Sequence, residues 1–108
     1  MTKDKSREFL YYYRIFAPNG PEPVAEYPFS KVIGRRHRFD WAWPEENVAV
    51  EVDGGVWKPG GGRHGSDTDR EKMNIACSLG WFVFHFSPAM LKSKPDVCIS
   101  FVTNALKK

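Results

Sequence analysis

Three carboxylic acids, Asp40, Glu51 and Asp53, lie in the stretch RHRFDWAWPEENVAVEVD, residues 36–53. Two runs of strand-forming residues flank Pro44-Glu45-Glu46-Asn47, which has turn chemistry because Pro presets φ and Asn tolerates unusual dihedral angles. The stretch therefore predicts a β-hairpin. Side chains alternate between the two faces of a strand, so the three acids are expected to share one face.

The register of this hairpin follows from its turn. We expect strands over residues 36–43 and 48–53. The cross-strand pairs are then Trp43–Val48, Trp41–Val50, Asp40–Glu51 and Arg38–Asp53. The opposite face is apolar and is expected to face the core, with Phe39, Trp41, Trp43, Val48, Val50 and Val52.

Such a cluster of acids is costly without a partner. Two carboxylates roughly 5 Å apart, at an effective dielectric constant of about 20, repel by about 3 kcal/mol. Either one carboxyl binds a proton or a divalent cation lies between them. Mg²⁺ binds through one or two carboxylates and keeps waters for a substrate phosphate. The alternative is an ordinary exposed face on which Arg38 and neighbouring bases neutralise the acids.

Asp40 followed by Glu51-Val52-Asp53 resembles the D…(D/E)-x-K core of the PD-(D/E)XK nucleases. The wider string FDWAWPEENVAVEVDGGVW…GRH is similar to small phage and bacterial members, both Holliday-junction-resolvase-like proteins and relatives of the very-short-patch-repair endonucleases. The resemblance covers roughly residues 6–88 and includes Glu71-Lys72 and Gly80-Trp81. It implies an α/β fold with a restriction-endonuclease-like core, a central mixed sheet flanked by helices.

The chain departs from that pattern at the usual catalytic lysine, where it has Asp53. Lys72 is our candidate replacement. It lies in a predicted helix over residues 68–79, on the same face as Ile75, Ala76 and Leu79. Burying an unpaired ammonium is expensive, so we expect Lys72 to point at the acids, where it could orient water or offset charge. The alternative is a lysine that snorkels past the helix edge.

The resemblance also implies a metal site for Mg²⁺ or Mn²⁺. Its ligands would be Asp40, Glu51, the carbonyl of Val52 and, from a first helix predicted over residues 7–16, Glu8. Asp53 would be a further ligand or an acceptor that positions water. An equal alternative for Glu8 is a solvated acid favoured by the helix dipole.

Basic residues gather beside the acids. Those predicted to contact DNA phosphates are Arg35, Arg36 and Arg38 before the hairpin, and Lys58, Arg63 and His64 in the glycine-rich loop after it. The net charge of +3 and the pI near 9.0 suit a polyanionic partner. His64 could also carry a proton. The alternative for the first group is a solvated strand end.

The remaining pattern predicts one domain over residues 1–108. We expect a helix capped by Ser6, an edge strand over 24–27, a buried strand over 81–86 with His85 as a core histidine, and a last helix over 95–106. Cys77 and Cys98 form no CxxC pair, which favours a reduced, cytoplasmic setting. No apolar run is long enough for a membrane span.

Together these expectations predict a metal-dependent DNA endonuclease of recombination or repair. The resemblance favours a branched substrate, with the four-way junction first, and symmetric cutting of a junction implies a homodimer. The alternatives are a nicking endonuclease of the very-short-patch-repair kind, a catalytically inactive DNA-binding module of the same fold, and a nuclease that acts on RNA.

Overall fold

The computed structural model describes residues 4–52 and 67–107. Its elements in chain order are α1 (Asp4–Phe16), β1 (Val24–Tyr27), the short 3-10 helix η1 (Lys31–Ile33), β2 (Phe39–Trp43), β3 (Val48–Val52), α2 (Asp67–Ser78), β4 (Phe82–Phe86), α3 (Pro88–Ser93) and α4 (Pro95–Leu106). None of the helices in these two ranges is long and apolar enough to cross a membrane.

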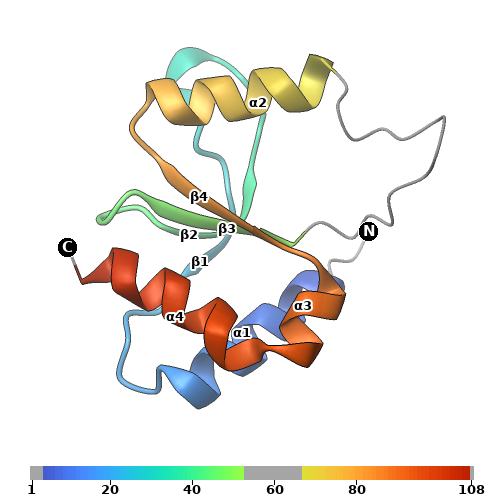
Figure 1. The fold of residues 1–108 in the computed structure, drawn as a ribbon. Coiled ribbons are helices and arrows are strands. Elements are labelled where there is room, and N and C mark those ends of the chain that lie inside the picture. The colour runs from blue at the N-terminus through green and yellow to red at the C-terminus, as the bar shows by residue number, and fades with distance from the viewer. Residues whose placement is uncertain (1–3, 53–66, 108) are drawn as a thin grey trace, which may run out of the picture.

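The four strands form one mixed sheet in the order β1-β2-β3-β4. β1, β2 and β3 are antiparallel neighbours, while β4 runs parallel to β3. Parallel neighbours need a long crossover, and α2 lies in that connection. Figure 1 shows α2 over one face of the sheet and α1, α3 and α4 over the other. The predicted α/β class with a mixed sheet and flanking helices is confirmed.

The hairpin has the predicted register. Trp43 pairs with Val48 and Trp41 with Val50. The turn between them is closed by the N–H of Glu46, which donates to the carbonyl of Trp43 at 3.0 Å. Asn47 takes the left-handed conformation, with φ of 57°, as its side-chain type allows. The turn chemistry therefore fixes which acids face each other.

Each face of the sheet has its own core. Under α1, α3 and α4 lie the hairpin side chains predicted to face inward, with the exception of Phe39. Under α2 lie Phe29, Phe39, Ala42, Ala49, Ile75 and Ala76. The prediction that Phe39 shares a face with Trp41 was wrong. Phe39 begins β2, outside the part paired with β3, and its ring stacks on Phe29 with centroids 3.8 Å apart.

The starts of two elements differ from the prediction, and one helix was not predicted. Ser6 lies inside α1 rather than capping it, and its carbonyl accepts a bond from Trp41 Nε1 at 2.8 Å. β2 begins at Phe39 and not at Arg36, because the backbone of His37 bonds to the buried Ser30 hydroxyl instead of a strand partner. The helix α3 was not predicted. Ser87 caps it by accepting from the N–H of Met90.

The fourth strand is less buried than predicted. It lies at the end of the sheet, so within the described residues it has a neighbouring strand along only one of its edges. Phe82 and His85 are exposed, and only Phe86 is fully buried. His85 is therefore not a core histidine. The last helix has the predicted bounds, and its residues Cys98, Ile99 and Val102 pack into the core under the sheet.

Trp43 is the largest fully buried side chain among the described residues, and its indole N–H donates to the carbonyl of Pro21 at 2.8 Å. We expect Trp43→Ala to lower the free energy of unfolding by about 3–5 kcal/mol, because it leaves a cavity. Urea denaturation followed by circular dichroism measures this. The matched control is Tyr11→Ala, which removes an exposed aromatic ring and should change stability by less than about 1 kcal/mol. Equal losses in the two variants would contradict the described core.

Candidate active site

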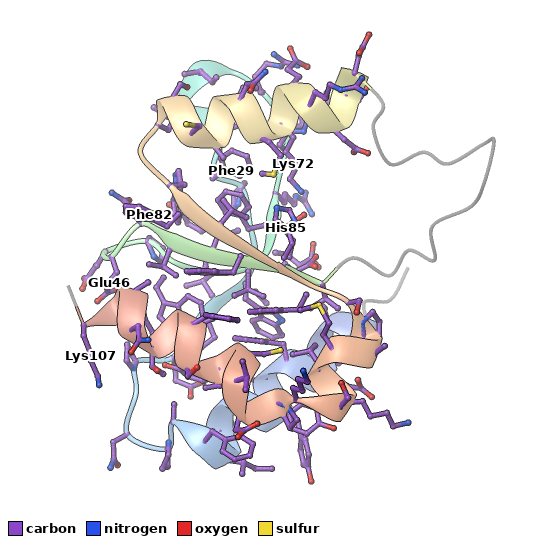
Figure 2. All side chains as sticks on the ribbon, viewed as in Figure 1. Phe29, Glu46, Lys72, Phe82, His85 and Lys107 are labelled. Carbon is purple, nitrogen blue, oxygen red and sulfur yellow. The ribbon has the colours of Figure 1, made fainter. Side chains whose placement is uncertain are left out.

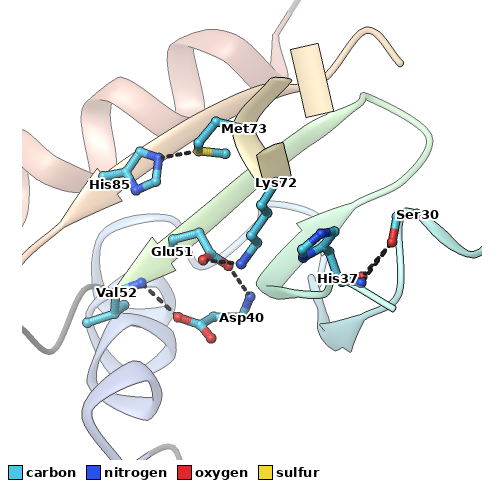
Figure 3. A network of polar contacts seen from close by, with 8 residues as sticks. All are labelled: Ser30, His37, Asp40, Glu51, Val52, Lys72, Met73 and His85. Carbon is cyan, nitrogen blue, oxygen red and sulfur yellow. Dashed lines mark hydrogen bonds and ion pairs between the residues drawn. The ribbon is translucent and has the colours of Figure 1, made fainter. Parts of the chain in front are cut away.

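Asp40 and Glu51 meet where the backbone pairing of the hairpin ends. Beyond the pair Trp41–Val50, the two strands are joined by hydrogen bonds from the backbone to carboxylate side chains. The N–H of Asp40 donates to Glu51 Oε2 at 2.9 Å, and the N–H of Val52 donates to Asp40 Oδ2 at 2.8 Å (Figure 3). Each carboxylate is thus bonded to the backbone of the opposite strand. The predicted proximity of the two acids is confirmed.

Both acids are largely removed from solvent. Asp40 is 8% exposed and the Glu51 side chain 13%. Burial raises the pKa of the Glu51 carboxyl, the Lys72 ammonium opposes this rise, and the nearby Asp40 adds to it. Hydrogen bonds from the backbone favour the charged form of a carboxylate. The pair therefore places negative charge in a site where it is costly to hold.

Lys72 reaches this pair from α2, the helix in the crossover between β3 and β4. Its Nζ donates to Glu51 Oε1 at 2.6 Å, and its side chain is only 20% exposed. The prediction that this lysine faces the acids rather than solvent is confirmed. The ammonium also lies 6.0 Å from the centre of the Phe39 ring, at the outer limit of a cation–π contact. Lys72 therefore supplies the positive charge nearest to Glu51 in the described part of the chain.

The donor set suits a hard divalent ion in type. Two carboxylates from adjacent strands are what Mg²⁺ or Mn²⁺ uses, with water filling the other positions. Both Glu51 oxygens already accept bonds from Lys72 and from the N–H of Asp40, so an ion would share this carboxylate with them. Within residues 4–52 and 67–107, no group of three or more His, Cys, Asp or Glu side chains is close enough to hold a metal. Glu8 is exposed and joins no such group.

The basic residues before the hairpin are on the surface. Arg35 makes a two-point ion pair with Glu71 of α2, at 2.8 and 2.6 Å. Arg36 and Arg38 are exposed, and they precede β2 instead of alternating within it as predicted. The remaining predicted site residues lie outside the described residues: Asp53, Lys58, Arg63 and His64.

Two histidines adjoin the site, and neither was predicted to belong to it. His85 is the register partner of Glu51 on β4, and its Nε2 lies 3.1 Å from Met73 Sδ (Figure 3). His37 lies on the other side of Lys72. Burial lowers the pKa of His37, and the nearby charges of Arg35 and Lys72 lower it further. The parallel pairing of β3 with β4 brings His85 beside Glu51, and no local pattern reveals that pairing.

Comparison of the chain with protein-family models, with curated proteins and with solved structures finds no match.

Lys72 and Glu51 should be energetically coupled. We expect Lys72→Met to lower the free energy of unfolding by about 1–3 kcal/mol, because it leaves a buried carboxylate without its cation; the residual exposure keeps the loss below that of a fully buried pair. The double variant with Glu51→Gln should lose less than the sum of the single variants. Urea denaturation of all four proteins measures the coupling. Strict additivity would contradict the ion pair.

Proposed function

We propose that this protein is a metal-dependent endonuclease that hydrolyses DNA phosphodiester bonds. The observation that carries the proposal is the arrangement of Asp40, Glu51 and Lys72: two nearly buried carboxylates held across a strand pair, with a lysine ammonium 2.6 Å from one of them. Two acids and a lysine suit the cleavage of a phosphodiester. The acids can hold a divalent cation, and the lysine can face the anionic phosphate.

Each residue has a distinct task in this proposal. Asp40 and Glu51 would hold Mg²⁺ or Mn²⁺, with the Val52 carbonyl as a further donor. The bound ion would supply a lowered pKa for its water and an electrostatic partner for the phosphate. The backbone bonds of Asp40 and Glu51 fix both carboxylates before substrate arrives. Lys72 keeps a positive charge at the site, where it offsets charge that develops on the phosphate oxygens.

The surroundings also suit a polyanion. Arg36 and Arg38 are exposed and directly precede β2, which carries Asp40. Bases at such positions can neutralise backbone phosphates without reading the base sequence. The chain has Asp53 where the family pattern has a lysine, and in this proposal Lys72, which reaches Glu51 from α2, takes the place of that lysine. Branched DNA is the substrate that we propose first, on the resemblance given above.

Cleavage assays with labelled four-way junction, mismatched, flapped and fully paired DNA test the proposal. We expect Mg²⁺- or Mn²⁺-dependent cutting that Asp40→Asn and Glu51→Gln each reduce by about 100-fold or more, because each removes an anionic donor. DNA binding in a mobility-shift assay should persist. The matched control is Glu22→Gln on the surface, whose carboxylate pairs only with exposed Arg14 in the described residues.

Three results would redirect or end the proposal. Metal-dependent cutting of RNA in preference to every DNA shape would replace the substrate class. Binding of DNA with no cleavage at any metal concentration would identify an inactive binding module. Cleavage that survives both Asp40→Asn and Glu51→Gln would reject this site.

Lys72 and a metal ion would share Glu51, and this gives a second prediction. We expect Lys72→Met to reduce cleavage by about 100-fold while Mn²⁺ binds at least as tightly, because the competing ammonium is gone. Glu51→Gln should lose both cleavage and Mn²⁺ binding. Calorimetric titration with Mn²⁺ alone measures the binding. Weaker Mn²⁺ binding in Lys72→Met would show that the lysine supports the fold of the site and does not act on the phosphate.

A further inference from the structure

An apolar tip projects into solvent at η1. Val32 is 77% exposed and Ile33 48%, and Val32 is the most exposed large hydrophobic side chain among the described residues. Single exposed apolar side chains are common on protein surfaces, so their exposure alone does not mark a binding site. Two further features set this tip apart, which are the fixed backbone at its base and the positive charge around it.

The base of the tip is fixed by hydrogen bonds. Ser30, which directly precedes η1, is fully buried. Its Oγ accepts from the N–H of His37 at 2.8 Å (Figure 3), and its carbonyl accepts from the N–H of Arg35 at 3.0 Å. Gly34 closes the turn with φ of 78°, and its N–H donates to the carbonyl of Lys31 at 2.9 Å. The two ends of the tip are therefore held together, and the tip is ordered before any partner binds.

The tip lies close to the candidate active site. Phe29, just before the base of the tip, stacks on Phe39, the residue before Asp40. Figure 2 shows Phe29 on the α2 side of the sheet, the side from which Lys72 reaches the acids. Ile33 lies seven residues before Asp40. Since a chain spans at most about 3.6 Å per residue, their Cα atoms are no more than roughly 25 Å apart.

Basic residues flank the tip on both sides in the chain. Lys31 begins η1, and Arg36 and Arg38 follow between the tip and β2; all three are exposed. The ion pair of Arg35 with Glu71 holds this segment against α2. Exposed ammonium and guanidinium groups bind phosphates without regard to base sequence. The charge of the segment therefore fits a polyanion, and its apolar tip fits a gap within that polyanion.

We propose that Val32 and Ile33 form a wedge that enters between adjacent bases of DNA. Proteins insert apolar side chains between base steps, which partly unstacks the bases and kinks the duplex. Lys31, Arg36 and Arg38 would contact the phosphates on either side of the step that the wedge enters. This inference rests on the proposed DNA substrate, but it does not depend on hydrolysis.

Such a wedge favours DNA that is already distorted. Unstacking a base costs free energy, and the cost is lowest where the base is mismatched, damaged or single-stranded. Two aliphatic side chains should therefore enter a fully paired duplex poorly and a branch point or mismatch readily. One strand advances about 3.4 Å per nucleotide, so the step that is entered should lie within about seven nucleotides of the phosphate at the candidate site.

A lipid surface is the other partner that apolar and basic residues together could bind. Stable membrane binding needs more apolar area than two short side chains provide, since even one myristoyl chain binds only marginally. A single base step, by contrast, offers a gap of the size that one or two side chains fill. DNA is therefore the better fit for this tip.

The fluorescence of 2-aminopurine, a base analogue that brightens when it is unstacked, tests the wedge. The analogue is placed at successive positions up to about seven nucleotides from the branch point of a four-way junction. Titrations use buffer without divalent metal, so that hydrolysis does not enter the measurement. We expect the wild-type protein to raise the fluorescence severalfold at one step and leave the more distant positions unchanged.

The variant Val32→Ser with Ile33→Ser should abolish this rise. It should also bind the junction about tenfold more weakly, while its affinity for fully paired duplex changes by less than about threefold. Val32→Phe with Ile33→Ser restores an apolar wedge and should restore the rise. The matched control is Val97→Ser on α4, which is 43% exposed on the other face of the sheet and should change neither measurement. Circular dichroism verifies that each variant is folded.

The flanking bases should behave differently from the tip. Arg36→Gln and Arg38→Gln should each weaken binding of every DNA shape and lower the slope of log affinity against log salt by about one. The preference for the junction over paired duplex should remain, because the wedge is intact. Loss of that preference in the arginine variants, with the preference retained in the double serine variant, would overturn the wedge.

Other outcomes separate the wedge from the proposed hydrolysis. A protein that binds and cuts junctions with no rise in fluorescence would overturn the wedge alone. A protein that unstacks the analogue but cuts no DNA would support the wedge and reject the hydrolytic function. Sedimentation with anionic lipid vesicles that the double serine variant loses, with no rise on DNA, would overturn the wedge in favour of a membrane contact.

Discussion

The structure depends on how the hairpin ends. Backbone pairing between β2 and β3 stops after Trp41 and Val50. Beyond that pair, the N–H of Asp40 donates to the Glu51 carboxylate and the N–H of Val52 donates to the Asp40 carboxylate. Buried N–H groups must be paired, and here two acids pair them. The same acids then carry negative charge at a place that is nearly closed to solvent. That charge needs a cation, and Lys72 is the one provided at 2.6 Å from Glu51.

This requirement explains the role of the crossover. A parallel neighbour for β3 requires a connection that passes over one face of the sheet, and α2 is the helix in that connection. Ile75 and Ala76 bury the apolar face of α2 against Ala42 and Ala49. Lys72 lies one turn before these residues, so the packing that holds the helix also carries the ammonium to Glu51. Stability and the proposed chemistry therefore use the same contact.

Much of the local structure could be predicted from the sequence. Pro44 and Asn47 mark the turn, the turn fixes the register, and the register brings Asp40 to Glu51. The inward position of Lys72 followed from helical spacing, since it shares a stripe with Ile75 and Ala76. These inferences work because they rest on periodicity and turn chemistry within a short segment. Ser87 followed by Pro88 is a local signal for the start of α3, because serine caps a helix and proline fits its first turn, although α3 was not predicted.

Other features depend on contacts between distant segments. Phe39 leaves the face that alternation assigns to it because Phe29, ten residues earlier, offers a stacking partner. His85 is exposed because β4 lies at the end of the sheet. A hydrophobic segment predicts a strand but does not predict the place of that strand in the sheet. Arg35 forms an ion pair with Glu71 of α2, which follows the hairpin in the sequence. No local pattern predicts these pairings.

The central claim is that Asp40 and Glu51 hold a divalent ion beside Lys72. The most direct test is a crystal structure from crystals soaked in Mn²⁺, with diffraction data that record the anomalous scattering of manganese. We expect one anomalous peak about 2.0–2.6 Å from an oxygen of each carboxylate. Absence of a peak between them at saturating Mn²⁺, with the bond from Lys72 to Glu51 unchanged, would contradict it.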